Sequence, residues 1–303
     1  MVEIGDEDDD PPPAEKRDVI AEAKSLHHMI THDRFNPYCK ACVRAGAQRK
    51  HKRAKKKIAA EGEFVSQKFG KNVTGDHLLD RRNEGTVDDN DLNDFPDARA
   101  AVVLYDRGTD WLDAFPKGSK SGKDTKVACQ EFAGPDDVIE SFYADNAPEL
   151  VSTAKELGWR MPTSTPGVPQ TNGVVERRVR IVKTGIRCLL AQAGLHKSWW
   201  PFACRATCIG HNTEVSPRKD DGVSPYYRRH GVHPKTPRIP FGVLVDYMPT
   251  PNPNKEPAPF DNKTSPGIFV GLHFQPGGKW SGDFLVADFQ AFQEEPDVQP
   301  GSH

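Results

Sequence analysis

Four residues near the N-terminus have types and spacing that could bind a metal ion. The pattern His28-x3-His32-x6-Cys39-x2-Cys42 places two imidazoles one helical turn apart and two thiols on a tight turn. Two imidazoles with two thiolates form the closed tetrahedral set of structural zinc sites. We predict that these residues bind one zinc ion, with His27 as an alternative to His28. The segment is too short to fold on its own apolar surface, so zinc would supply the missing stability.

Three acidic residues far apart in the sequence form a second candidate site. Asp76 lies within a strand-like run, Asp145 ends the apolar strand predicted over 138–144, and Glu176 lies in the first turn of a long predicted helix. A sheet could bring them together, and the carboxylates would then repel one another unless cations neutralised them. Mg²⁺ or Mn²⁺ prefers such oxygen ligands. Two ions about 3.5–4 Å apart can stabilise both the attacking and the leaving oxygen of a phosphoryl displacement.

Basic residues are concentrated in two blocks, although the formal net charge is only −2. Residues 40–57 and residues 177–187 carry Lys and Arg but no acid, which suggests a polyanionic partner such as nucleic acid. A solvated linker and a solvated helix face are the alternative explanation. On the long helix Glu176 and three bases fall at i, i+4, i+7 and i+11, so they form one stripe on which a DNA backbone could lie. The candidate nucleic-acid contacts in the two blocks are Arg49, Lys50, Lys52, Arg53, Arg177, Arg180, Lys183 and Arg187.

The remaining cysteines are expected to be structural. Cys204-x3-Cys208-x2-His211 also has helical spacing, but Trp, Phe, Ala and Ile surround it, so we assign it to the core. Cys129 and Cys188 are interpreted in the same way. The acidic N-terminus does not fit a signal peptide, and the chain has no apolar run long enough to span a membrane. We therefore expect an intracellular protein with reduced cysteines and no membrane partner.

Composition and periodicity predict a mixed α/β protein. The chain has 303 residues, of which 36% are hydrophobic and 28% charged, so about two globular domains can form. Strands and helices alternate in a way that fits a mixed sheet better than a doubly wound parallel one. After residue 240 short strands separated by Pro, Gly and Asn turns suggest a small β-barrel. The predicted strands are 72–79, 99–105, 110–115, 138–144, 159–163, 241–247, 267–272 and 284–289, and the predicted helices are 123–132, 148–157, 173–194 and 197–212.

These elements and charge runs divide the chain into six predicted segments. The first is an acidic disordered tail with a proline triplet, and the second holds the His/Cys cluster. A basic linker separates that module from the α/β core, and a further linker separates the core from the C-terminal β domain. The predicted boundaries are 1–23, 24–46, 47–63, 64–215, 216–240 and 241–295.

The order of motifs along residues 26–290 resembles a retroelement integrase of the copia type. The chain carries HxxxH…CxxC, then an Asp-bearing strand, then YDRGTDWLDAFPK, ADNAPE and TPGVPQTNGVVER. Downstream it carries WWPFA…HNT, SPYY, IPFGVLV and SPGIFVGL, which resemble the region after the catalytic core in that family. Three features depart from the family: a shorter gap between Asp145 and Glu176, a short His-to-Cys gap, and an acidic insert at 84–97.

The resemblance implies an RNase H-like core in which Asp76, Asp145 and Glu176 bind Mg²⁺ or Mn²⁺. It also implies an N-terminal zinc-binding module and a small C-terminal β-barrel that contacts DNA. Arg180 and Lys183 match basic helix residues that face the DNA end of the element, and Asn172 would lie in the loop beside the catalytic Glu. The implied activity is that of a polynucleotidyl transferase, which processes element ends and joins them to target DNA by two-metal transesterification. A nuclear location and a homo-oligomer are expected with it.

Three other functions remain open from the sequence. A catalytically degenerate or host-adopted integrase would keep the zinc site and bind nucleic acid without joining it, and the shortened Asp145–Glu176 gap suggests this alternative. Another RNase H-like enzyme, such as a transposase or nuclease, fits less well because of the upstream zinc module. A zinc protein that binds RNA through residues 40–57 is the last alternative. The chain also lacks protease and polymerase motifs, as a piece of a longer polyprotein would.

Overall fold

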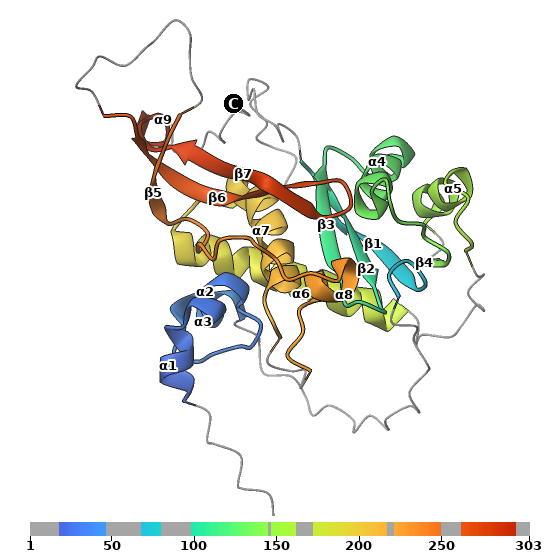
Figure 1. The fold of residues 1–303 in the computed structure, drawn as a ribbon, viewed down its shortest axis with the longest axis horizontal. Helices are drawn as coiled ribbons and strands as arrows, with labels where there is room; N and C mark the ends of the chain where they lie inside the picture. The colour runs from blue at the N-terminus through green and yellow to red at the C-terminus, as the bar shows by residue number, and fades with distance from the viewer. Residues whose placement is uncertain are drawn as a thin grey trace, which may run out of the picture.

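A mixed four-stranded sheet forms the centre of the molecule (Figure 1). The computed structural model describes residues 18–46, 68–79, 98–144, 147–161, 172–216, 221–249 and 262–294. The strand order is β3-β2-β1-β4, in which β1 pairs antiparallel with β2 and parallel with β4, while β2 pairs antiparallel with β3. The predicted mixed sheet and its hairpin are therefore confirmed. The strands are β1 (Val73–Leu79), β2 (Ala100–Asp106), β3 (Leu112–Lys117) and β4 (Phe142–Ala144).

Two of the predicted strands are shorter than expected. The strand predicted over 138–144 is restricted to β4, because only its last residues pair with β1. In the described part of the strand predicted over 159–163, Arg160 forms a single parallel bridge with Ser141.

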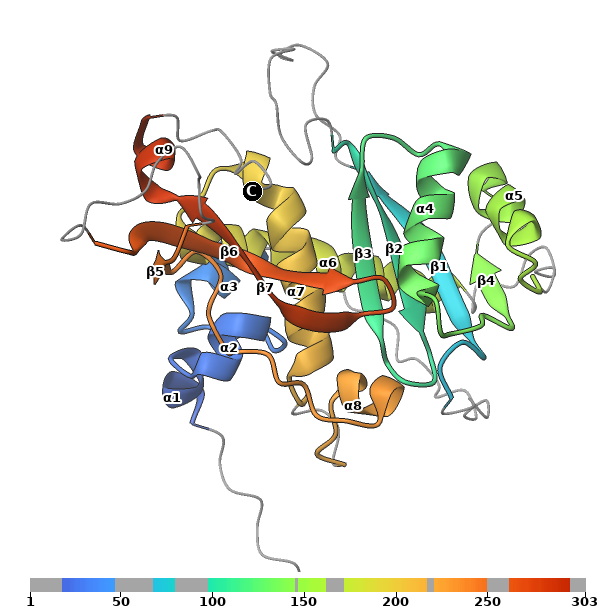
Figure 2. The ribbon, with the colours of Figure 1, turned by 45° about the horizontal axis from the view of Figure 1, so that its top comes forward.

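Helices cover both faces of the sheet (Figure 2). Val102 and Leu104 of β2 pack against α4 (Gly122–Ala133) and α5 (Pro148–Glu156). The alternate residues Val103 and Tyr105 face α6 (Asn172–Ala193) and α7 (Trp200–Thr213). The short 3-10 helix η1 (Lys197–Trp199) lies between these two helices. Because successive side chains of a strand point to opposite faces and both faces are covered, β2 is fully buried and carries only apolar and aromatic residues before Asp106.

The apolar spacing of α6 explains which of its faces is buried, and one small residue explains how closely it packs against α7. Val175, Val179 and Val182 are buried at helical spacing, as the sequence predicts. At Gly185 α6 crosses α7 so closely that an added Cβ would lie 2.3 Å from Thr207 Cγ2. Glycine therefore sets the distance between the two helices that cover this face of the sheet.

Three short helices form the N-terminal end of the chain, where α3 packs against α6, α2 packs against α6 and α7, and α1 packs against α2 (Figure 1). They are α1 (Val19–Ala23), α2 (Leu26–Thr31) and α3 (Lys40–Gly46). The predicted disorder over 1–23 is wrong for residues 18–23, since Asp18 caps α1 by accepting hydrogen bonds from Ile20 N and Ala21 N. The Asn36 side chain also donates to Val19 O at 2.7 Å, which ties α1 to the loop after α2.

The described C-terminal residues form a three-stranded sheet against the core, and the predicted barrel is not confirmed. In the described part of the chain β5, β6 and β7 make a three-stranded antiparallel sheet. Ile268 and Val270 of β6 belong to the same apolar cluster as α6 and α7, so one face of the sheet is already covered. These elements are β5 (Leu244–Tyr247), β6 (Ser265–Gln275), β7 (Lys279–Asp288) and α9 (Phe289–Glu294).

One helix lies where the sequence predicts only a linker. Helix α8 (Pro225–His230) begins at Ser224, whose hydroxyl accepts a hydrogen bond from Tyr227 N, and Pro225 occupies the first helical position. The predicted basic linker 47–63 and the acidic insert 84–97 lie outside the described residues. Among the helices of the described segments, each is too short or too polar to cross a bilayer.

Candidate functional site

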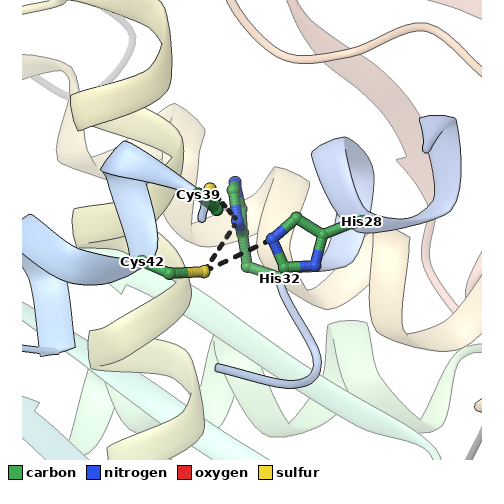
Figure 3. A group of neighbouring side chains, drawn as sticks. All are labelled: His28, His32, Cys39 and Cys42. Atoms are coloured by element: carbon green, nitrogen blue, oxygen red, sulfur yellow. Dashed lines mark hydrogen bonds between the residues drawn. The ribbon is translucent and has the colours of Figure 1, made fainter. Parts of the chain in front are cut away.

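The four predicted zinc ligands point toward one another in the structure (Figure 3). Cys42 Sγ lies 3.4 Å from both His28 Nε2 and His32 Nδ1, and Cys39 Sγ lies 3.8 Å from His32 Nδ1. A tetrahedral zinc with ordinary bond lengths would separate nitrogen and sulfur ligands by about 3.5 Å. All four donor atoms lie within 4.8 Å of one another. The cluster is therefore compatible with zinc in both its donor types and its size.

The structure distinguishes His28 from its neighbour His27. His28 is 2% exposed and faces the two cysteines. The His27 ring turns away, with Nδ1 3.2 Å from Glu214 Oε2 and Nε2 3.5 Å from the Thr31 hydroxyl. His28 therefore belongs to the cluster, and His27 belongs to the contact between α2 and the end of α7.

Local capping brings the two histidines and the two cysteines together. Ser25 caps α2 by accepting a hydrogen bond from His28 N, which starts the helix one turn before His32. His32 ends α2 in the left-handed conformation with φ of 44°, so the chain reverses toward Cys39. Asn36 then accepts a hydrogen bond from Tyr38 N, which closes the turn before α3. The Cys188 thiol of α6 lies beside this cluster and, with the two histidines, lowers the pKa of Cys42.

Asp76 lies on the sheet face that α6 covers. In the register of β1 with β2, Asp76 pairs with Val103, and Leu78 pairs with Ala101. Directly opposed residues of antiparallel strands point to the same face, and Leu78, Ala101 and Val103 pack in the cluster that contains α6. Asp76 is half-buried, and its Oδ1 accepts a hydrogen bond from His77 N at 2.7 Å.

The described part of the strand that precedes Asp145 ends one residue before it. Strand β4 ends at Ala144, which pairs with Gly75, the residue before Asp76. Asp145 follows Ala144 in the sequence and lies outside the described residues, as does Asp80, the acid near Asp76.

Glu176 and the basic stripe lie on α6. This helix begins at Asn172, so Glu176 is its fifth residue rather than part of the first turn. Asn172 is the first helical residue, and its predicted place in a loop is wrong. The helix packs against β1, the strand that carries Asp76. Glu176 is exposed, and so are the predicted contacts Arg177, Arg180, Lys183 and Arg187. The predicted contacts Arg49, Lys50, Lys52 and Arg53 lie outside the described residues.

A buried ionic cluster fixes the first half of α6, and the sequence analysis missed it. Arg178 donates to Asp110 Oδ1 at 2.9 Å and stacks over the Tyr105 ring. Tyr105 donates its hydroxyl proton to the same carboxylate oxygen at 2.7 Å. The His211 ring from α7 lies 2.9 Å from Asp110 O, and burial lowers its pKa. This cluster positions α6, and with it Glu176, over the β2–β3 turn.

The four cysteines that the sequence assigns to the interior are all buried, namely Cys129, Cys188, Cys204 and Cys208. Cys204 and Cys208 are fully buried in the core beside α6, and burial raises the pKa of both thiols. Cys129 is fully buried on the other face of the sheet. Asp106 is also buried and accepts hydrogen bonds from Gly70 N and Thr109 N, so it closes the β2–β3 turn.

Comparison with known proteins identifies similarity to a curated sequence. No protein-family model matches the chain. The chain is similar to a retrotransposon polyprotein. Over 139 residues it is 41% identical to the retrovirus-related Pol polyprotein from transposon RE1 of Arabidopsis thaliana. The match covers 44% of this chain but only 9% of that polyprotein, so the chain spans less than a tenth of its relative.

Solved structures of retroviral integrases are partly similar to the chain. The catalytic core domain of BIV integrase has a TM-score of 0.38 and 17% identity, covering 52% of this chain and 91% of its own length. The HTLV-2 integrase catalytic core domain in complex with magnesium has a TM-score of 0.40 and 14% identity, covering 55% and 99%. A simian T-cell lymphotropic virus intasome has a TM-score of 0.44 and 12% identity, covering 78% and 84%. The resemblance to a retroelement polyprotein predicted from the sequence is confirmed over these 139 matched residues.

Proposed function

We propose that the chain is a retroelement integrase, a polynucleotidyl transferase that joins element DNA ends to target DNA. The pairing of Gly75 with Ala144 carries this proposal, because it aligns the residues immediately before Asp76 and Asp145 on neighbouring strands. The similarity to the retrotransposon polyprotein gives independent support for a role in DNA integration.

Strand geometry supports the convergence of the two aspartates. Phe142 and Ala144 pack on the face of α4 and α5. Asp145 follows Ala144 directly in the sequence, and successive side chains of a strand point to opposite faces. Asp76 lies on the opposite face, the one that α6 covers, and Glu176 lies on α6 itself. The three carboxylates would then surround the edge where β1, β4 and α6 meet.

Each group in this site has a distinct role in the proposed reaction. The three carboxylates supply hard oxygen ligands, the donor set that Mg²⁺ or Mn²⁺ prefers. Two such ions, when bound, would stabilise the attacking and leaving oxygens of the phosphodiester exchange. Arg180, Lys183 and Arg187 would hold DNA phosphates along α6, downstream of Glu176. Because these bases contact phosphate rather than base edges, the choice of target would depend little on sequence.

The His/Cys cluster would hold a structural zinc ion in the same protein. His28, His32, Cys39 and Cys42 would fill all four positions, which leaves no site for a substrate. The zinc would stabilise α2 and α3, whose contacts with α6 place the module beside the core. Joining two element ends requires two active sites, so we also propose that the protein acts as a homo-oligomer, in the nucleus.

The decisive experiment removes one carboxylate charge at a time. We expect Asp76→Asn, Asp145→Asn and Glu176→Gln each to abolish the joining of a labelled DNA duplex to a plasmid in Mg²⁺ or Mn²⁺. DNA binding should persist in each variant, because the basic residues of α6 are unchanged. Glu176 is exposed, so its substitution should leave the fold intact.

Glu156→Gln is the matched control for that experiment. Glu156 is an exposed glutamate on α5 that pairs with Lys126, so its substitution removes the same charge far from the proposed site. The control should join DNA at the wild-type rate. Unimpaired joining by Glu176→Gln would refute the proposed triad. A wild-type chain that binds DNA but joins none would instead be the degenerate, zinc-containing nucleic-acid-binding protein.

A further inference from the structure

The second half of α6 carries two side chains that contact the His/Cys cluster from outside. Gln192 Oε1 lies 3.1 Å from His32 Nε2. Cys188, one helical turn earlier, lines the same cavity as His32 and Cys42, and its Sγ lies 4.0 Å from Ala41 O, the residue before Cys42. One helix of the core therefore contacts one histidine of the N-terminal module and packs beside its buried cysteine.

The orientation of the Gln192 amide determines how His32 is protonated. Gln192 Nε2 donates a hydrogen bond to Met29 O at 3.1 Å, so Oε1 is the atom that faces His32. An amide oxygen can only accept, so His32 Nε2 must carry the proton and donate it. This leaves the lone pair on His32 Nδ1, the atom 3.4 Å from Cys42 Sγ. The core helix thus selects the tautomer that can bind a metal.

Water has little access to these contacts. His32 is 7% exposed, Cys42 3% and Cys188 1%. Helix α3 lies directly against α6, and the Cys188 side chain also points toward Ala41 O. If the module left α6, His32 Nε2 would lose its partner and the Cys188 thiol would become accessible.

We propose that Gln192 and Cys188 form the outer shell of the zinc site, so that zinc binding and docking of α1–α3 on the core are coupled. This inference rests on zinc binding by the four residues proposed above, but not on catalysis. Gln192 is a positioning residue, because it orients a ligand without touching the metal. Coupling between two binding equilibria is reciprocal, so docking strengthens zinc binding and zinc strengthens docking by the same factor.

Zinc affinity of the full chain, measured by competition with a chromophoric chelator, tests the role of Gln192. Gln192→Leu removes the acceptor, and we expect a 10–100-fold weaker affinity, the usual effect of losing an outer-shell partner. Gln192→Glu keeps an acceptor for His32 Nε2 and should remain closer to wild type. Gln130→Leu, at an exposed position of α4, is the matched control and should leave the affinity unchanged.

The two Gln192 variants also distinguish positioning from packing. If Gln192 only filled space, Leu would be tolerated and Glu would be the harmful substitution. Equal zinc affinities for wild type and Gln192→Leu, or weaker binding by Glu than by Leu, would overturn the inference. A wild-type chain that binds no zinc would overturn both this inference and the proposed metal site. The DNA-joining assay is read separately in all these cases.

Alkylation of the full chain, mapped by peptide mass spectrometry, tests the docking. We expect Cys188 to be protected in the zinc-loaded protein and to react after zinc is removed by a chelator. Cys204 and Cys208 are 0% exposed within the core and should stay protected in both states. Protection of Cys188 in the zinc-free chain, or reaction of all three cysteines together, would contradict coupled docking.

Discussion

His230 is a half-buried ring whose neutral form stabilises the fold. Its ring packs edge-on to Trp111, with centroids 5.4 Å apart, and lies 4.5 Å from the centroid of Tyr226. Burial, together with the nearby positive charge of Arg229, lowers its pKa to about 4. The unfolded chain would protonate this histidine near its ordinary pKa of 6.5. Between those two values the unfolded state binds more protons than the folded state.

We therefore predict that stability falls as the pH drops from 6.5 toward 4. The slope from one such group is at most about 1.4 kcal/mol per pH unit, and partial exposure of the ring makes it smaller. His230→Phe keeps the aromatic contacts but cannot be protonated, so it should flatten this dependence in urea unfolding at pH 7 and pH 5. His273→Phe, at a side chain that is 54% exposed, should not change the slope. An unchanged slope in His230→Phe would show that other groups control it.

Some residues of the site could be predicted from the sequence, and others could not. The cluster of His28, His32, Cys39 and Cys42 was predictable because the spacing is local: a helical turn and a tight turn bring the four residues together. The Arg178–Asp110 pair was not, because it joins residues 68 positions apart through the packing of α6 on the β2–β3 turn. Gln192 was missed for the same reason, since its contact with His32 spans 160 positions. No pattern around these residues distinguishes them from other charged and polar side chains.

Among the elements, the β6–β7 hairpin makes an unexpected contact with the core. At its tip Gly277 N donates to Glu131 O of α4 at 2.8 Å, and Lys279 Nζ lies 2.8 Å from Asp136 Oδ2. Gly278 has φ of 79°, and an added Cβ would lie 2.3 Å from Trp111 Cζ2. The tip therefore fits against Trp111 only because residue 278 has no side chain.

We predict that Gly278→Ala destabilises the protein more than Gly282→Ala. Gly282 also has positive φ, of 115°, but an added Cβ there would meet nothing within 4 Å. Both substitutions would carry a backbone cost of about 1–2 kcal/mol, and Gly278→Ala would add about 1–3 kcal/mol of overpacking against Trp111. The difference in unfolding free energy between the two variants, from denaturant titration, measures the steric contribution alone. Equal values would mean that the tip does not press on Trp111 in solution.

The elements themselves were largely predictable, and their association was not. Apolar periodicity located α6, α7 and the strands of the central sheet within a few residues. Helix α8 was missed because it is short and lies in a segment rich in Arg, Pro and Gly. The barrel prediction was drawn from strand-like segments alone. Such segments do not show whether their apolar face closes on itself or packs on a neighbour, as β6 packs on α7.

For the whole molecule, the position of the charges says more than the net charge, because exposed bases are concentrated along one side of α6. Although the net charge is −2, α6 presents exposed bases along one stripe. Their apolar neighbours Val179, Val182 and Ile186 are buried in the core, so the stripe is fixed relative to the sheet. A rigid row of bases can neutralise successive phosphates of one DNA backbone.

We predict that replacing Arg180, Lys183 and Arg187 together by Gln weakens DNA binding and its salt dependence. The slope of log K against log salt should become shallower by about 0.9 for each phosphate that the variant no longer neutralises. Fluorescence anisotropy of a labelled duplex over a range of salt concentrations measures the slope. A control variant replaces three exposed bases on or beside α4 and α5, namely Lys123, Lys155 and Arg160. A larger change of slope in the control would place the DNA on the opposite face.

The contact of β6 and α9 with the core determines which fragments of this protein can be prepared. Ile268, Val270 and Ala287 are buried in the same cluster as α7, and Phe292 packs on Trp199. A chain shortened at residue 240 would expose that apolar surface to water and would be prone to aggregate. The C-terminal sheet is therefore inseparable from the α/β core: a soluble fragment has to keep both, and an exchange between related proteins has to carry both together.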